Sequence, residues 1–211
     1  GNSTRIKNKN IKKYLNSSLL EISIMNALKS KYVCDVCITS ESQKILNISK
    51  KYPVILIKRP KKLSNNLIMP DYAVVHAINK IKKKFDYIIL LHPTSPLRSY
   101  KHIDEAIVKA EKEKADSLLS AFKTHSFLWR RSKKNYIKPI NYNYLKRPRS
   151  QDNIQFQENG AIYVTKAHIY KKYNNRLGGR ISVYPMNFWE SFDVDNVEDL
   201  KNIQLLQKSF K

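Results

Sequence analysis

The stretch from Phe85 to Arg98, FDYIILLHPTSPLR, decides the fold that the sequence predicts. Tyr87 to Leu91 form a short, continuous apolar run, which is typical of a strand buried on both faces in a parallel sheet. The run stops at His92, and Pro93 and Pro96 then fix two φ angles and remove two amide donors. A stiff polar loop at the carboxyl end of a buried strand is where open α/β sheets bind ligands. An ordinary turn is the alternative, and this stretch alone does not decide between the two.

Composition limits the class of protein. A chain of 211 residues with 42% hydrophobic residues suits one large domain with a substantial core, or a domain with a small appendage. It carries no apolar run of membrane-spanning length and no signal-peptide pattern, so we expect a cytoplasmic protein without a membrane partner. Cys34 and Cys37 are three apart in an expected strand and face opposite sides, so we expect buried structural thiols.

The formal net charge is +23, from 40 Lys and Arg against 17 Asp and Glu. Such a charge fits nucleic acid, an anionic surface or anionic small substrates. The lysines are spread over the whole chain and interleaved with other residue types, which favours solvated faces over one binding stripe. Since no nucleic-acid motif is present, we expect only weak, salt-sensitive and sequence-independent binding to nucleic acid.

Strand and helix patterns alternate along the chain with short connections, which predicts a parallel sheet covered by helices on both faces. Strands are expected at 33–38, 54–57, 87–91, 117–121, 159–164 and 181–184, and helices at 19–28, 40–48, 70–83, 102–114 and from 197 to the end. Ser40 and Gln43 predict a capping box for the second helix. Pro70 fits the first turn of the third helix, with Asp71 near its positive end, and Asn196 fits the N-cap of the last.

The segment from Phe122 to Phe156 breaks this alternation. It has no clean helical period, many aromatic residues and the basic cluster Lys146-Arg147-Pro148-Arg149. We expect an excursion out of the main sheet, either a small β-rich lobe or an oligomer contact.

Asp193 and Asp195 are separated by one residue near the last helix. On an extended segment this spacing puts both carboxylates on one side, close enough to share a hard cation. The alternative is that Asp195 belongs to the start of the last helix while Asp193 is merely exposed. The spacing alone leaves both open.

Five blocks of the sequence together resemble the acylneuraminate cytidylyltransferases, the CMP-sialic acid synthetase family. They are GNSTRIKNKNIK at the start, KRPKKLSNN, LLHPTSPLR, RSQDNIQFQENGAIYV and SFDVDNVEDL. The order and spacing of the blocks are specific, and they span nearly the whole chain. The resemblance implies a single Rossmann-like α/β nucleotidyltransferase domain over residues 1–211, with the excursion at 122–156 as the lobe that makes a homodimer.

The resemblance also implies a reaction. The family joins the cytidylyl group of CTP to the anomeric hydroxyl of a 2-keto sugar acid, such as a sialic or other nonulosonic acid, and releases pyrophosphate. An in-line attack on the α-phosphorus needs Mg²⁺ and cationic groups to neutralise charge, with both reactants held in place. The related enzyme class for the eight-carbon acid Kdo is an alternative that the match near the carboxyl end makes less favourable.

The resemblance also implies roles for particular residues, at the positions of this sequence that match the family's motifs. The nucleotide loop takes Ser3, Lys9 and Asn10, with Lys9 on the phosphates, and Arg59 matches the cytidine pocket. Asp193 and Asp195 match the Mg²⁺ ligands and, with Lys9, are the predicted catalytic residues. The substrate-binding positions that the resemblance implies are His92, Thr94, Ser95, Arg149 and Asn159.

The sequence departs from the family at several points. The family has an arginine that supports the triphosphate at the end of a first strand, and this sequence begins one residue after it. We therefore expect the natural chain to continue upstream; a true deletion, giving an inactive protein, is the alternative. His92 stands where glutamine is common, Asn66 where aspartate is usual, Trp129 near a lysine position and Gln157 at an arginine position. These differences leave the particular nonulosonic acid open.

Overall fold

The computed structural model describes residues 8–14, 16–64, 68–133 and 135–209. Its main sheet has the strand order β10-β6-β9-β5. The strands are β5 (Tyr87–Leu91), β6 (Ser117–Thr124), β9 (Gln155–Lys166) and β10 (Ile181–Pro185). β10 runs parallel to β6, whereas β9 runs antiparallel to both β6 and β5. β3 (Cys37–Ser40) and β4 (Ile55–Lys58) form a separate parallel pair.

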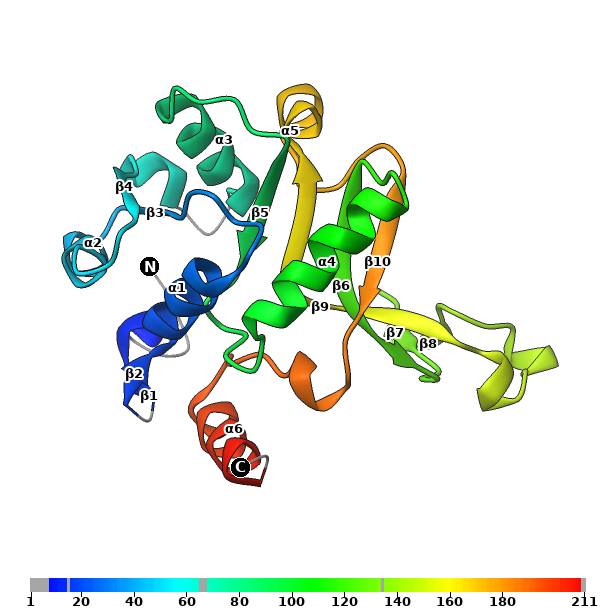
Figure 1. The fold of residues 1–211 in the computed structure, drawn as a ribbon. Helices are drawn as coiled ribbons and strands as arrows, with labels where there is room; N and C mark the ends of the chain where they lie inside the picture. Colours follow the sequence, from blue (N-terminus) through cyan, green and yellow to red (C-terminus); the bar gives the residue numbers. More distant parts are fainter. Residues whose placement is uncertain (1–7, 15, 65–67, 134, 210–211) are drawn as a thin grey trace.

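The predicted α/β fold is confirmed, with a correction to the sheet. Parallel pairing holds for β10 with β6 and for β3 with β4, but the long strand β9 makes the main sheet mixed. The helices are α1 (Leu19–Lys29), α2 (Gln43–Ser49), α3 (Pro70–Lys80), α4 (Tyr100–Lys112), α5 (Ala167–Tyr173) and α6 (Val197–Ser209). Figure 1 shows α4 lying across the sheet. Its buried face, with Ile103 and Ala106, packs against Leu118, Ile162 and Val164.

Local side-chain contacts explain where the main helices begin. Ser18 and Glu21 form a capping box at α1, and Ser99 and His102 form one at α4. The predicted N-cap of α6 is confirmed, because the Asp199 amide donates to Asn196 Oδ1 at 2.9 Å. These contacts satisfy amide groups that the first helical turn leaves without partners.

Three expectations near the amino end are wrong. Ser40 does not cap a helix, because it is the last residue of β3 and its Oγ accepts from the Ser42 amide instead. The strand expected from residue 33 begins at Cys37. Cys34, which precedes that strand, is exposed, and Cys37 is half-buried; burial raises the pKa of the Cys37 thiol to about 11.

The decisive strand has the predicted bounds but not the predicted burial. All five residues of β5 are only partly buried. The reason is its place at the end of the main sheet, where β9 is its one strand neighbour among the described residues. The expected strand upstream of Gly1 lies outside the described residues and stays a prediction.

Other boundaries shift without changing the order of elements. α3 ends at Lys80 instead of 83, α4 begins at Tyr100 instead of 102, and β9 extends in both directions beyond the expected 159–164. The short helix α5 was not predicted.

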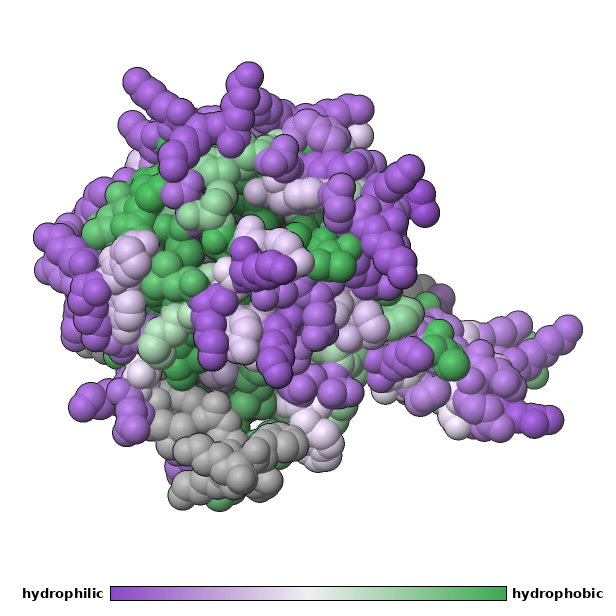
Figure 2. All heavy atoms as spheres, in the orientation of Figure 1, coloured by the Kyte–Doolittle hydropathy of each residue, from purple (hydrophilic) through white to green (hydrophobic). Residues whose placement is uncertain are grey.

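The chain leaves the main sheet over a shorter span than the predicted 122–156, because residues 122–124 and 155–156 still pair as the ends of β6 and β9. β7 (Trp129–Arg131) and β8 (Ile137–Pro139) form an antiparallel hairpin. Figures 1 and 2 show this lobe protruding from the body of the molecule. It carries large exposed apolar side chains, namely Leu128, Trp129, Tyr136, Ile137, Ile140, Tyr144, Leu145, Ile154 and Phe156.

Among the described residues, no helix has both the length and the apolar character needed to cross a membrane.

Candidate active site

The two predicted metal ligands flank a buried residue. Val194 is fully buried, and its amide donates to the Thr94 carbonyl at 2.8 Å. This hydrogen bond ties the segment before α6 to the loop that follows β5. Asp193 and Asp195, on either side of this buried residue, are both exposed.

Lys9 joins this acidic segment from the far end of the chain. Its Nζ donates to the Val194 carbonyl at 2.6 Å and to Asp195 Oδ1 at 3.2 Å. The Lys9 side chain is 12% exposed, so the cation is held at the segment and is not free in solvent. The structure therefore brings together the three residues predicted to be catalytic.

Asp193 has a carboxyl group with a perturbed pKa. The residue is exposed, but partial desolvation of its carboxyl raises the pKa above the usual value, and the neighbouring charge of Asp195 adds to this rise. Thr94 and the positive charge of Lys9 act in the opposite direction. A cation bound between the two acids would favour the charged form of both.

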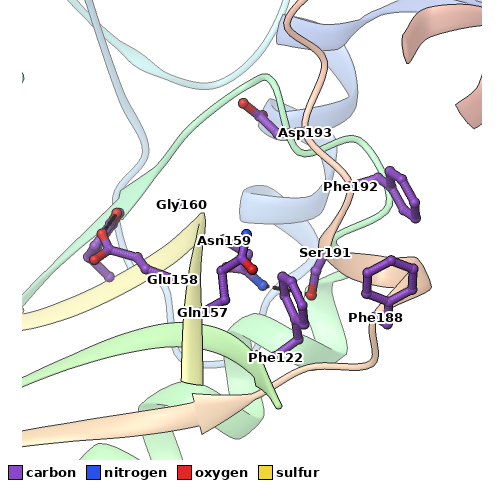
Figure 3. A pocket seen from close by; sticks show the side chains of 10 residues that line it. Phe122, Gln157, Glu158, Asn159, Gly160, Phe188, Ser191, Phe192 and Asp193 are labelled. Carbon is purple, nitrogen blue, oxygen red and sulfur yellow. Dashed lines mark hydrogen bonds between the residues drawn. The ribbon is translucent and has the colours of Figure 1, made fainter. Parts of the chain in front are cut away.

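A cavity of about 520 Å³ opens beside Asp193. Figure 3 shows that its lining comes from the end of β6, from β9 and from the segment before α6. The aromatic side chains of Phe122, Phe188 and Phe192 gather on one side, and Glu158 points away from them. The lining residues are Phe122, Gln157, Glu158, Asn159, Gly160, Tyr163, Phe188, Ser191, Phe192 and Asp193.

Asn159 lines the cavity, but its side chain is committed to internal hydrogen bonds. Its Oδ1 accepts from Ser120 Oγ at 2.6 Å and from the Ala161 amide at 3.1 Å. Its Nδ2 donates to Ser191 Oγ at 2.9 Å, the contact drawn in Figure 3. Asn159 thus holds the cavity wall together, and its predicted contact with substrate stays a prediction.

The loop after β5 is fixed by a buried cation. Arg98 Nη1 donates to the carbonyls of His92 at 2.9 Å and Ala161 at 2.8 Å, and Nη2 donates to Ser23 Oγ at 2.6 Å. Burial of Arg98 lowers its pKa to about 10. Ser95 lies within this loop, 2% exposed, and its Oγ has no hydrogen-bond partner among the described residues. Arg98 therefore links the loop to β9 and α1, a role that local sequence pattern did not reveal.

A second missed cluster lies behind His92. Arg176 donates to Asp71 through Nε at 3.0 Å and through Nη2 at 2.7 Å, and its Nη1 lies 3.3 Å from His92 Nε2. Burial together with the charges of Arg176 and Arg98 lowers the pKa of His92 to about 4. The only sequence signal was an aspartate in the first turn of α3, which was interpreted as a helix-end charge.

Not all predicted residues lie at this centre. Arg59 donates to Glu41 Oε2 at 2.6 Å and to Ser64 Oγ at 3.0 Å, near β4. Asn10 follows Lys9 in a short 3₁₀ turn, and its Oδ1 is buried without a partner among the described residues. Arg149 is exposed on the lobe. Ser3 and Asn66 lie outside the described residues.

Comparison with known proteins agrees with this architecture. The family described as "Cytidylyltransferase" matches residues 1–210. N-acylneuraminate cytidylyltransferase A of Danio rerio is 27% identical over 92% of this chain, which spans only 46% of that relative. Pseudaminic acid cytidylyltransferase of Campylobacter jejuni is 26% identical, with 99% of this chain and 93% of the relative covered. A solved CMP-2-keto-3-deoxy-manno-octonic acid synthetase complexed with CTP superposes with a TM-score of 0.73 at 12% identity, covering 99% of this chain and 95% of that one.

The sheet, the loop after β5 and the Lys9–acid contact define an α/β protein with a nucleotidyltransferase fold. The match to the family extends over residues 1–210 and identifies the protein more specifically than the likeness in fold does. This chain belongs to the cytidylyltransferase family.

Proposed function

We propose that this protein transfers the cytidylyl group of CTP to a sialic-type nonulosonic acid and releases pyrophosphate. The observation that carries the proposal is the contact of Lys9 with the segment from Asp193 to Asp195, beside a cavity of about 520 Å³. Membership of the cytidylyltransferase family supports the transferred group. The names of the relatives, which specify N-acylneuraminate and pseudaminic acid, support the class of acceptor.

Asp193 and Asp195 fit a Mg²⁺ ion in their chemistry. Within the described residues no group of three or more His, Cys, Asp or Glu side chains is placed to hold a metal. Mg²⁺ in nucleotide sites commonly takes one or two carboxylates, with phosphate oxygens and water completing the shell, so a pair suffices. When bound, the ion would neutralise phosphate charge and lower the pKa of a coordinated hydroxyl.

Lys9 supplies the second charge for the phosphates. Its ammonium group is held by the Val194 carbonyl and by Asp195, so it is placed before the nucleotide arrives. When CTP binds, Lys9 Nζ would donate to a phosphate oxygen in place of Asp195 Oδ1. The Asp195 carboxylate could then contact the metal. Preorganised charge of this kind costs no rearrangement in the transition state.

The cavity suits the sugar acid. Its volume falls in the range of small-molecule sites, roughly 300–1,000 Å³. Phe122, Phe188 and Phe192 offer an apolar wall for acyl substituents, whereas Glu158 and Gln157 offer polar groups for hydroxyls and amides. The eight-carbon acid Kdo remains the alternative acceptor, but the likeness to the Kdo enzyme, at 12% identity, concerns the fold alone.

Pyrophosphate release from the full-length protein tests the proposal. We expect release that depends on CTP, on Mg²⁺ and on one of N-acetylneuraminate, legionaminate or pseudaminate, with Kdo as the comparison acid. Turnover with Kdo alone would change the acceptor class. If none of the acids gives CTP-dependent turnover, the proposed function is wrong.

We propose further that the protein is a homodimer formed through the lobe at 122–156, with Arg149 near the partner's active site. Trp129, Ile137 and Leu145 are 45%, 59% and 78% exposed, and large apolar side chains gathered on one exposed lobe commonly mark a protein–protein contact.

The lobe gives a direct prediction about assembly. Light scattering at micromolar concentration is expected to give the mass of two chains, and Leu145→Glu is expected to shift it to the mass of one, because a buried unpaired charge opposes association. Val108→Glu, at an exposed apolar position on α4, is the control and should leave the dimer intact. A monomeric natural protein would contradict the proposal.

A further inference from the structure

The strand β9 leaves its regular register with β6 beside the cavity. Tyr163 of β9 is opposite Leu119 of β6. Glu158, five positions before Tyr163, is opposite Ala121, which is only two positions after Leu119. Side chains five positions apart on a regular strand face opposite sides of the sheet, but this irregularity brings Tyr163 and Glu158 into contact. Gly160 lies within it at a φ of +69°, a conformation that glycine adopts readily.

Buried polar contacts hold the irregular part of β9 in place. Ser120 is fully buried, and its Oγ accepts from the Ile162 amide at 2.7 Å and donates to Asn159 Oδ1 at 2.6 Å. The Ser120 side chain thus takes the place of a strand-to-strand hydrogen bond. Because these polar groups are satisfied, the irregularity is a fixed feature of the fold, of the kind that re-aims a side chain beside an active site.

Tyr163 fixes one oxygen of the Glu158 carboxylate. Tyr163 is buried, and its hydroxyl donates to Glu158 Oε1. Burial, together with the hydrogen bond and the charge of Glu158, raises the pKa of Tyr163 above its usual value, although the Arg176 guanidinium over its ring opposes this rise. The hydroxyl therefore keeps its proton near neutral pH. Glu158 is exposed at the cavity wall, and its Oε2 has no hydrogen-bond partner among the described residues.

The cavity wall carries negative charge without positive charge. Among the described residues that line it, Glu158 and Asp193 are acids and none is Lys, Arg or His, in a chain with 40 Lys and Arg. Figure 3 shows Glu158 on the side opposite Phe122, Phe188 and Phe192. A carboxylate accepts hydrogen bonds but does not donate them, and it repels the carboxylate of a sugar acid. The part of the acid that meets Glu158 must therefore be an uncharged donor, a hydroxyl or an amide N–H.

We propose that Glu158 is a specificity-determining residue whose Oε2 binds a hydroxyl or an amide N–H of the sugar acid, with Tyr163 as its positioning residue. The inference rests on the proposed function and deepens it, because it sets the orientation of the acid in the cavity. The donor-bearing part of the acid lies at Glu158, and the carboxylate of the acid is directed away from this wall.

The sign of one substitution tests this contact. In Glu158→Gln the amide oxygen can still accept from Tyr163, which turns the NH₂ group toward the cavity and removes the acceptor there. We expect KM for the sugar acid to rise about tenfold, as loss of a hydrogen bond to a charged group does, with kcat and KM for CTP unchanged. Without the proposed contact, removal of a negative charge would instead lower KM for an anion. A lowered or unchanged KM would overturn the inference.

A second substitution tests the positioning role. Tyr163→Phe keeps the charge of Glu158 but no longer holds its carboxylate. KM for the sugar acid should rise about threefold in the otherwise natural protein and not at all in the Glu158→Gln protein, because two residues that act through one contact are not additive. An equal rise in both proteins would show that Tyr163 acts independently of Glu158 and would contradict this role.

Glu105→Gln is the matched control. Glu105 also accepts from a tyrosine hydroxyl, that of Tyr184, but it is not among the residues that line the cavity. This variant should leave KM for the sugar acid unchanged. Turnover with a KM change of the opposite sign in Glu158→Gln overturns the inference alone, whereas a natural protein without CTP-dependent turnover with any acid overturns the proposed function as well.

Discussion

Asp193→Asn and Asp195→Asn are each expected to lower kcat by about 1,000-fold, in line with the loss of a preorganised charge at a reacting phosphate. The two carboxylates flank the buried Val194, and Lys9 already contacts this segment. An amide keeps the shape of the carboxylate but loses the charge that a hard cation requires. The defect should persist at saturating CTP, because the lost interaction acts in the transition state and not only in binding.

Stability measurements separate this effect from misfolding. The circular dichroism spectrum and melting temperature of both variants should stay close to those of the natural protein, since neither carboxylate is needed to bury Val194. Glu198→Gln is the matched control, an equivalent loss of charge at an exposed position in the first turn of α6, and should keep normal kcat. Near-normal turnover of both aspartate variants in excess Mg²⁺ would show that the pair only precedes the last helix.

Asp71→Asn is expected to lower the free energy of unfolding by about 3–5 kcal/mol, because it leaves a buried guanidinium without its counter-charge. Asp71 is 1% exposed and the Arg176 side chain is 13% exposed. Asp71 accepts from the Arg176 amide at 2.9 Å as well as from the guanidinium, so the pair fixes both backbone and side chain. Burial alone lowers the pKa of Arg176, but the hydrogen bonds and charge of Asp71 outweigh it and raise that pKa above its usual value.

Urea unfolding of two aspartate variants measures this difference. Asp35 pairs with Lys83 at 2.9 Å, but the Lys83 side chain is 61% exposed, so Asp35→Asn should cost less than about 1 kcal/mol. If Asp71→Asn costs no more than Asp35→Asn, the Arg176–Asp71 pair does not stabilise the fold as its burial implies.

The features that the sequence predicted well are those specified by neighbouring residues. The apolar run ending at two prolines predicted β5 and its loop with correct bounds, and Asn196 predicted the start of α6. The missing helical period after Ala121 indicated an excursion, and the hairpin of β7 and β8 lies within the predicted span, although the two ends of that span continue β6 and β9.

The features that the sequence did not predict depend on contacts between residues far apart in the chain. Asp71 meets a partner 105 positions away, and its local context indicated only a helix end. Arg98 lies in the loop after an apolar strand, yet it is fully buried because the Ala161 carbonyl of β9 and Ser23 Oγ of α1 accept its hydrogen bonds. β9 runs antiparallel because of the chain reversal through the lobe, and no pattern within residues 155–166 reveals its direction.

The central claim is cytidylyl transfer, and the phosphorus-containing products test it most directly. The full-length protein would be incubated with CTP, Mg²⁺ and each acceptor acid while ³¹P NMR spectra are recorded. Our account predicts that the triphosphate signals give way to pyrophosphate and one phosphodiester signal in equal amounts, only when a nonulosonic acid is present. Unchanged CTP with every acid, or its conversion to CDP and inorganic phosphate, would contradict it.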